Sequence, residues 1–263
     1  MPQKTWSHIQ KEAKQLVDSE PSLVSLVHET IINQVDFGHC LAFHLANKFS
    51  DACMNAVSYN HLLLGLIKEN DSIVESAIAD LKAIKERDPA CECYTVPLLY
   101  FKGFLAIQAA RIAKVLWNQN RKVMALHIQS RSSELFGTDI HPAATMGKGL
   151  FLDHATGFVV GETAVIGNNV SILHAVTLGG SGKESGDRHP KVGDGVLIGA
   201  GAKLLGNINI SEGAKIGAGS VVLEDVPAHT TFVGNPAKAV GKTSHKFPAR
   251  FMEHNIDHPD YEI

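Results

Sequence analysis

The sequence has few cysteines, no excess of basic residues and no long hydrophobic run. Its 263 residues contain four cysteines, all within the first 93 positions, which is too few for a disulfide framework in a chain of this length. The 24 Lys and Arg residues are outnumbered by 27 Asp and Glu residues, which argues against nucleic acid as the main partner. A membrane span needs roughly 20 consecutive apolar residues, and the apolar runs are much shorter. We therefore expect reduced thiols and no membrane segment.

Two further absences bear on location and on metal chemistry. The first residues lack the apolar core of a secretory signal, so we expect a cytoplasmic protein. The Cys91-Glu-Cys93 pair has no second Cys or His pair at the spacing of a zinc site. We predict no bound metal.

Glycine is scarce in the first half of the chain and frequent in the second. Three of the 23 glycines lie at positions 1–136, and all the others lie at positions 137–263. Since a uniform domain would not divide its composition in this way, we expect two structural regions that meet near Gly137. We place a helical domain at 1–136, a repeat domain at 137–240 and a C-terminal tail at 241–263.

The first region has the apolar spacing of amphipathic helices. Apolar residues recur at steps of three and four in the segments 6–17, 23–35, 37–49, 52–67 and 72–84. The segment 98–133 is long and helix-prone, with Gly103 as its only breaker. A turn at Arg87-Asp88-Pro89-Ala90 interrupts the helices, because the residue before a proline is disfavoured in the helical conformation. Asp88 is either a local cap of that turn or a ligand-binding group.

From Ile140 onward an aliphatic residue returns every six positions. This period fits neither a helix nor a simple strand, and it is typical of a parallel β-helix built from hexapeptides. Three hexapeptides make one triangular coil of about 18 residues, so we expect four or five coils. The predicted fold is a helical domain followed by a left-handed parallel β-helix. The repeat positions are Ile140, Met146, Leu152, Val160, Ile166, Ile172, Leu178, Val192, Ile198, Leu204, Ile210, Ile216 and Val222.

The repeat loses its phase at two places. The step from Leu152 to Val160 exceeds one hexapeptide by two positions, and the step from Leu178 to Val192 exceeds two hexapeptides by two positions. A solenoid places such insertions on its outer surface, where loops commonly carry function. The second insertion is rich in glycine, so we expect a flexible loop at 179–190.

Ionisable residues gather beside both breaks. Asp139 precedes the first break, Asp153 and His154 lie within it, and Arg188 and His189 close the second. Slightly less than one coil separates Asp139 from His154, so we expect them to lie close together on neighbouring coils. A carboxylate bonded to one imidazole nitrogen makes the other nitrogen a better base. We therefore predict a general-base pair.

These motifs resemble those of the bacterial serine O-acetyltransferases. The resemblance lies in Asp139-Ile140-His141-Pro142, in the segment 152–157 and in Asp187-Arg188-His189-Pro190-Lys191. The segment 233–238 is shared more widely with hexapeptide acyltransferases, and the helical half around Asp88-Pro89-Ala90 fits the same family. The resemblance implies transfer of an acetyl group from acetyl-CoA to the hydroxyl of L-serine, the first step of cysteine biosynthesis.

The resemblance also implies roles for the polar residues. His154 would take the proton from the serine hydroxyl, and Asp139 would orient His154. Transfer would be direct, without an acyl-enzyme.

A zwitterionic substrate needs an anionic partner for its ammonium group and a cationic partner for its carboxylate. Asp88 and Asp153 suit the ammonium group, Arg188 suits the carboxylate, and His189 is an extra donor. L-Cysteine would use the same contacts, so we expect it to be a feedback inhibitor.

The resemblance implies further binding partners. Acetyl-CoA would be a co-substrate, with no tightly bound cofactor, and its pantetheine arm would lie beside Gly180, Ala200, Gly219 and Lys238. Relatives on this fold assemble as trimers with active sites between subunits, and the helical half joins two trimers, so we expect a hexamer. The terminal Ile263 would insert into O-acetylserine sulfhydrylase.

Three other functions are open to a hexapeptide protein. A zinc carbonic anhydrase needs three converging histidines, but the position five after His189 is Asp194. A sugar or antibiotic acetyltransferase shares the repeat and a catalytic histidine, but it lacks the helical half with Asp88 and the amino-acid-binding Arg188. A purely structural scaffold would not need ionisable residues at the breaks.

Overall fold

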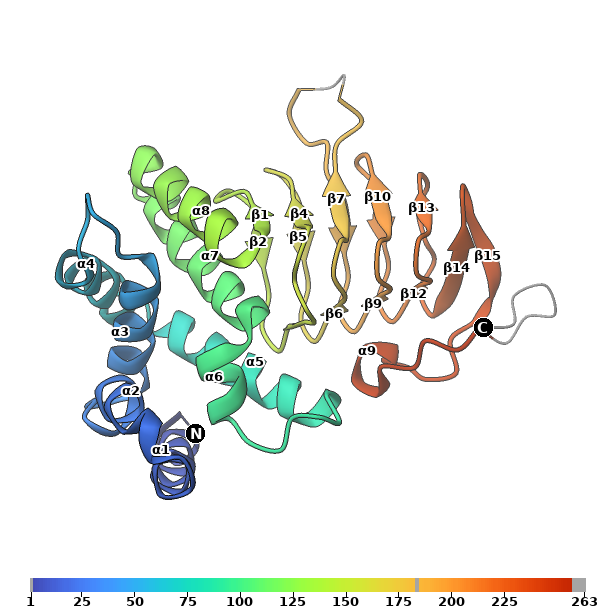
Figure 1. Ribbon diagram of the computed structural model, residues 1–263. Helices are drawn as coiled ribbons and strands as arrows, with labels where there is room; N and C mark the ends of the chain where they lie inside the picture. Colours follow the sequence, from blue (N-terminus) through green and yellow to red (C-terminus); the bar gives the residue numbers. More distant parts are fainter. Residues whose placement is uncertain (1, 183–184, 257–263) are drawn as a thin grey trace.

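The structure is a computed structural model that describes residues 2–182 and 185–256. A bundle of helices leads into a column of short strands, and the two parts lie side by side (Figure 1). The predicted fold class, a helical region followed by a β-helix of hexapeptide repeats, is confirmed.

Short turns separate the helices of the first part. Within the helix-prone segment 98–133, the chain forms α6, α7 and α8, with α7 and α8 joined by a tight turn. Asn120 takes a left-handed conformation there (φ 59°), which asparagine tolerates better than most residues. The predicted helix 23–35 is likewise divided. The helices are α1 (Pro2–Ser19), a 3₁₀ turn (Pro21–Leu23), α2 (Val24–Val27), a π-helical turn (His28–Ile32), α3 (Phe37–Phe49), α4 (Ala56–Lys68), α5 (Asp71–Arg87), α6 (Thr95–Tyr100), α7 (Lys102–Asn118) and α8 (Lys122–Phe136).

The strands form three sheets, which are the three faces of the column. Sheet A contains β1 (Thr138–Ile140), β4 (Phe158–Val160), β7 (Thr177–Gly179), β10 (Lys203–Leu205) and β13 (Val221–Val222). Sheet B contains β2 (Thr145–Met146), β5 (Val165–Ile166), β8 (Lys191–Val192) and β11 (Asn209–Ile210). Sheet C contains β3 (Phe151–Leu152), β6 (Ser171–Ile172), β9 (Leu197–Ile198), β12 (Lys215–Ile216), β14 (Thr230–Gly234) and the antiparallel β15 (Ala237–Lys242).

The strand register follows the six-residue repeat. On sheet C, Leu152 pairs with Ile172, which pairs with Ile198, and Ile198 pairs with Ile216. These side chains point inward and are buried, because each coil stacks its aliphatic residue on the next. Both phase breaks fall at corners of the column. The extra residues at 153–157 form the corner between sheets C and A, and residues 180–190 form a corner between sheets A and B.

The helical domain is attached to the first coil through α5 and α7. Gly103 packs against the backbone of β3 so closely that a Cβ atom would lie 2.1 Å from the Leu152 carbonyl oxygen, which only glycine permits. The fully buried Asp80 carboxylate accepts hydrogen bonds from the Arg111 guanidinium and from the Leu150 amide at 2.8 Å. Both contacts fix α7 and α5 against the coils, and α5 leads directly into the loop at 88–94.

The chain folds back over the column after β15. A short helix, α9 (Pro248–Phe251), contacts α5. The Ser171 hydroxyl donates to the Ala249 carbonyl at 2.8 Å and accepts from Arg87 at 3.1 Å. Within the described part of the chain, no helix has the length and apolar character needed to cross a membrane.

Candidate active site

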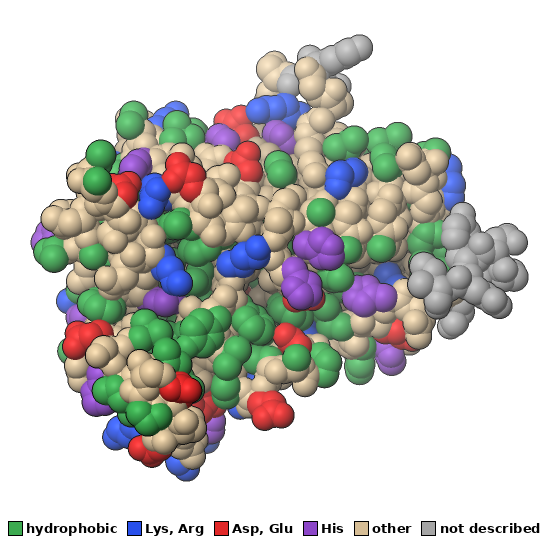
Figure 2. Space-filling view, in the orientation of Figure 1, with side chains coloured by type: hydrophobic (Ala, Val, Ile, Leu, Met, Phe, Trp, Pro, Cys, Tyr) green, Lys and Arg blue, Asp and Glu red, His purple; other side chains and the backbone are tan. Residues whose placement is uncertain are grey.

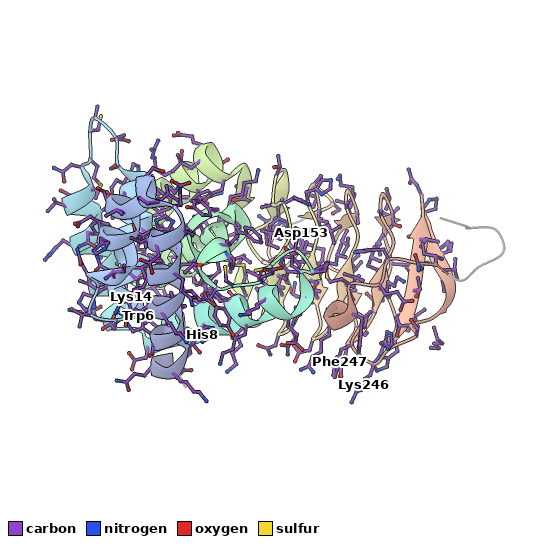
Figure 3. All side chains as sticks on the ribbon, turned by 60° about the horizontal axis from the view of Figure 1, so that its bottom comes forward. Trp6, His8, Lys14, Asp153, Lys246 and Phe247 are labelled. Carbon is purple, nitrogen blue, oxygen red and sulfur yellow. The ribbon has the colours of Figure 1, made fainter. Side chains whose placement is uncertain are left out.

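A cavity of about 570 Å³ lies where the helices meet the first coil. Three of the residues singled out in the sequence line it, namely Asp88, Asp153 and His154. Histidine side chains gather on this part of the surface, between the helices and the coils (Figure 2), and Asp153 lies at the same junction (Figure 3). Two carboxylates and an imidazole therefore share one hollow.

Asp88 and Asp153 come to the cavity from different elements. Asp88 directly follows α5, and its carboxylate accepts a hydrogen bond from the Ala90 amide at 2.9 Å, so it both shapes the turn and lines the cavity. Asp153 directly follows β3 at the corner between sheets C and A. Of the two alternatives for Asp88, the turn contact is present, and the ligand-binding role stays a prediction.

His154 is presented on a strained turn. His154 and Ala155 both have left-handed backbones (φ 58° and 59°), which is costly for residues with side chains and is common at functional sites. The Lys102 ammonium group donates to the Thr156 hydroxyl, which ties this turn to the start of α7. The His154 side chain is 73% exposed, and its Nε2 lies 3.6 Å from an Asp153 carboxylate oxygen.

The predicted hydrogen bond between Asp139 and His154 is not formed among the described residues. The Asp139 carboxylate accepts instead from Gln129 of α8, and the nearest carboxylate to His154 is Asp153. The cause is the first coil, which is longer than three hexapeptides because Ile140 pairs with Val160. Asp139 therefore lies in the middle of β1 on the face of sheet A, whereas His154 lies at the corner before β4.

Arg188 and His189 lie away from the cavity, at the corner between sheets A and B. The Arg188 guanidinium donates to the Glu162 carboxylate at 2.8 Å, and this bond holds the pKa of Glu162 below its usual value. The Thr163 hydroxyl accepts from the amides of Arg188 and His189 at 3.0 and 3.2 Å.

The His189 ring has a defined tautomer. Its Nδ1 accepts from the Thr163 amide at 3.2 Å, so the proton of the neutral ring is on Nε2. Burial, followed by the charges of Arg188 and Lys191, lowers the pKa of His189, which favours this neutral form. A Cβ atom on Gly161 would lie 2.0 Å from the ring, so the ring rests on a glycine. The ring can donate from Nε2.

Of the four residues predicted to contact CoA, three lie at the two corners and Lys238 lies on sheet C. Ala200 and Gly219 lie at the corner between sheets C and A, on the coils beyond His154, and Lys238 lies in β15 with its ammonium group 2.8 Å from Glu224. Gly180 begins the loop on the other corner, where a Cβ atom would lie 3.3 Å from the Arg188 carbonyl oxygen.

The structure adds site residues that the sequence analysis did not single out. Lys102 bonds Thr156 at the corner between sheets C and A, and Glu162 bonds Arg188 at the corner between sheets A and B. No sequence pattern indicates either contact, because the partners are distant in the chain. His174 lies one coil beyond His154, with ring centroids 5.8 Å apart and an interplanar angle of 77°. The spacing could have identified His174. Ile172 is the pairing partner of Leu152, and His174 follows His154 at the same interval in the sequence.

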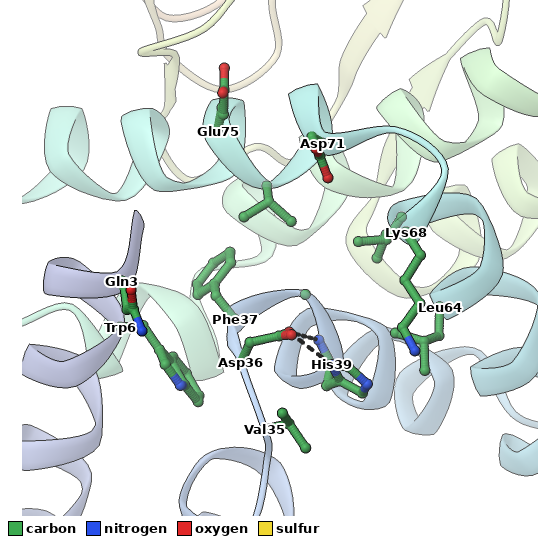
Figure 4. A pocket seen from close by; sticks show the side chains of 13 residues that line it. Gln3, Trp6, Val35, Asp36, Phe37, His39, Leu64, Lys68, Asp71 and Glu75 are labelled. Carbon is green, nitrogen blue, oxygen red and sulfur yellow. Dashed lines mark hydrogen bonds and ion pairs between the residues drawn. The ribbon is translucent and has the colours of Figure 1, made fainter. Parts of the chain in front are cut away.

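A second cavity, of about 440 Å³, lies among the helices (Figure 4). It is lined by apolar side chains and by several polar and charged ones, among them Asp36, whose carboxylate accepts from the His39 amide at 2.9 Å and lies 2.8 Å from the His39 ring. Asp36 is the N-cap of α3, so its position has a structural explanation. None of the predicted site residues lines this cavity.

Two predictions concern features that this structure does not place. Ile263 lies outside the described residues. Within residues 2–182 and 185–256, no three His, Cys, Asp or Glu side chains converge as ligands for a metal ion.

Comparison with known proteins identifies the family. The model for the serine acetyltransferase N-terminal region matches residues 5–109, and the bacterial transferase hexapeptide model matches residues 189–224. A serine acetyltransferase of Haemophilus influenzae is 53% identical over 244 residues, which cover 93% of this chain and 91% of that protein.

Solved structures of serine acetyltransferases superpose closely on this chain. A complex with cysteine has a TM-score of 0.95 at 51% identity, covering 97% of this chain and 100% of the other. The soybean enzyme complexed with serine has a TM-score of 0.88 at 56% identity, covering 90% and 97%. The Brucella abortus enzyme in complex with coenzyme A has a TM-score of 0.90 at 47% identity, covering 92% and 96%. With its helical half, its repeat and nearly its whole length matched, this chain belongs to the serine acetyltransferase family.

Proposed function

We propose that this protein transfers the acetyl group of acetyl-CoA to the hydroxyl of L-serine, giving O-acetyl-L-serine and CoA. The observation that carries the proposal is the cavity in which Asp88 and Asp153 flank the exposed His154. Two carboxylates suit an ammonium group, and a neighbouring imidazole suits the removal of a hydroxyl proton. The product is the first intermediate of cysteine biosynthesis, as the family resemblance implies.

The chemistry is general-base catalysis with direct transfer. The His154 imidazole takes the proton of the serine hydroxyl while the oxygen attacks the thioester carbonyl. The tetrahedral intermediate then expels the CoA thiolate, which takes the proton from the imidazolium and so restores the neutral base. The base contributes roughly a hundred- to ten-thousandfold in rate, and the fixed positions of two substrates contribute more.

The serine carboxylate needs a cationic partner, and the residues that line the cavity of one chain do not include Arg188 or His189. Arg188 and His189 suit this role, but they lie at the far end of the sheet A strands. One chain therefore offers its acidic corner to a second copy, and the second copy offers Arg188 and His189 in return. A cyclic trimer satisfies all of these half-sites at once, and two trimers joined through their helical domains make a hexamer.

The corner between sheets C and A provides a track for the pantetheine arm. Ala200 and Gly219 follow His154 along this corner, and their small side chains leave room beside the backbone. Gly180 of the neighbouring copy would close the other side, and Lys238 lies beyond them on sheet C. Acetyl-CoA binds along this track as a co-substrate.

L-Cysteine is the inhibitor that the same site accommodates, because it differs from serine only in its thiol. The tail with Ile263 is assigned to O-acetylserine sulfhydrylase on the family resemblance alone.

The test is an acetyl-CoA thiol-release assay with L-serine, L-homoserine, a galactoside and glucosamine as acceptors. We expect turnover with L-serine to exceed turnover with either sugar by at least about a hundredfold, since a galactoside carries neither charge and glucosamine lacks the carboxylate that Arg188 would pair. Good turnover with a sugar and little with serine would overturn the proposal in favour of a sugar or antibiotic acetyltransferase.

A further inference from the structure

Two imidazole rings occupy consecutive levels of the corner between sheets C and A. His154 follows β3 and His174 follows β6, and Leu152 pairs with Ile172 just before them. The turns interlock, because the Ala175 amide donates to the Thr156 carbonyl at 2.8 Å and the Gly201 amide donates to the His174 carbonyl at 2.9 Å. The backbone that carries His174 is therefore fixed on both sides.

The His154 ring has little else to hold it. Its side chain is 73% exposed, and its side-chain contacts within the described residues are a 3.6 Å approach to Asp153 and the edge contact with His174. The carboxylate distance exceeds that of a good hydrogen bond. An exposed side chain with weak contacts samples several rotamers, and a general base must lie within hydrogen-bond reach of its proton to act.

We propose that His174 is a positioning residue for His154, and that its ring holds the His154 imidazole in the orientation that faces the serine hydroxyl. The two rings meet edge to face at 5.8 Å, which is a favourable aromatic geometry. The role needs a flat ring at this level of the corner, not a titratable group. This inference rests on the proposed function, since it assigns a partner to its general base.

The next levels of the same corner support this role. Beyond His174 the corner carries Ala200 and then Gly219, where a Cβ atom would meet nothing within 4 Å. The large side chains are thus confined to the two levels nearest the acidic cavity, and the small ones to the track beyond. A ring at the second level braces the first ring without blocking the remainder of the track.

The experiment compares three replacements of His174 in the intact oligomer. His174→Ala removes the ring, His174→Gln retains a hydrogen-bond donor without a ring, and His174→Phe retains the ring without a donor. We expect about three- to tenfold lower kcat for the Ala and Gln variants, with KM for both substrates within about twofold of wild type. His174→Phe should keep kcat within about twofold of wild type. The matched control is His61→Ala, at an exposed histidine of α4.

A double-mutant cycle separates this role from general support of the fold. If His174 acts through His154, then His174→Ala in the background of His154→Ala causes no further loss of rate. An equal loss in both backgrounds, or rescue by Gln and not by Phe, would overturn the proposal. Serine acetylation by the wild-type protein is measured in parallel. If the wild type does not acetylate serine, the proposed function fails; if only the variants behave unexpectedly, the role of His174 fails.

Discussion

Asp153 and Arg188 lie at opposite ends of the sheet A strands within one chain. Asp153 precedes β4 at the corner between sheets C and A, and Arg188 pairs with Glu162 at the corner that follows β4. The three residues of β4 alone separate these corners by about 10 Å, and Arg188 lies one coil further along the column. A single serine cannot bridge this distance, so the proposed site, if it uses both residues, draws them from two copies.

Glu162 orients Arg188, so its charge should affect serine binding and not the chemical step. Glu162→Gln retains the shape of the side chain and loses the charge-assisted hydrogen bond to the guanidinium. We predict about a three- to tenfold higher KM for serine, with kcat nearly unchanged, because the interaction acts on ground state and transition state alike. The measurement is a serine titration at saturating acetyl-CoA.

Glu134→Gln is the control for this variant, since Glu134 pairs with Arg131 on the exposed side of α8. An unchanged KM for serine in Glu162→Gln would show that Arg188 needs no help from this carboxylate.

Two roles of Asp139 can be separated by mutation: assistance to His154 in catalysis and anchoring of α8 to β1. If its carboxylate turns from Gln129 to His154 during catalysis, Asp139→Asn lowers kcat by about tenfold or more, whereas Gln129→Leu leaves kcat close to wild type. We expect this result because a carboxylate stabilises the imidazolium and an amide does so poorly. Equal losses in the two variants would mean that Asp139 only anchors α8 to β1.

His44 makes the stability of the helical domain dependent on pH. It is buried, its Nε2 lies 3.1 Å from the Leu99 carbonyl oxygen, and burial lowers its pKa to about 4. The unfolded chain, with an ordinary pKa near 6.5, binds the proton first as pH falls, so stability is full above about pH 6.5 and is lost between there and about pH 4.

Between pH 7.5 and pH 5, the free energy of unfolding of the wild type should fall by about 2 kcal/mol more than that of His44→Gln. Urea unfolding of both proteins at equal concentrations measures this difference. Parallel losses in the two proteins would rule out His44 as the source.

Much of the fold is predictable because each coil of the β-helix requires an inward-facing aliphatic residue at a fixed interval of the sequence. The aliphatic positions from Ile140 to Val222 face the core, and both phase breaks fall at corners. The helical half carries weaker signals. The turn at 119–121 is missed because it contains neither glycine nor proline, and only the left-handed Asn120 marks it.

The residues of the candidate site can be named from the sequence, but their arrangement cannot. The turn before Pro89 singles out Asp88, and the breaks in the repeat single out Asp153, His154 and Arg188. Neither signal says which corner of the column the last three occupy, because that depends on how an insertion is shared between coil and loop. Lys102 and Thr156 are 54 positions apart and meet only because α7 packs on β3. Contacts of this kind between two domains produce no periodic pattern in the sequence.

The most direct test of a site shared between copies mixes two inactive subunits. His154→Ala and Arg188→Ala chains are expressed together with different affinity tags, and the mixed oligomers are purified through both tags and assayed with L-serine. In a hexamer of two cyclic trimers with random mixing, about one interface in four joins an intact His154 to an intact Arg188, whereas in a free trimer that carries both tags it is about one in three. The account predicts about a quarter of wild-type activity. Activity no greater than that of the two variants assayed separately would contradict it.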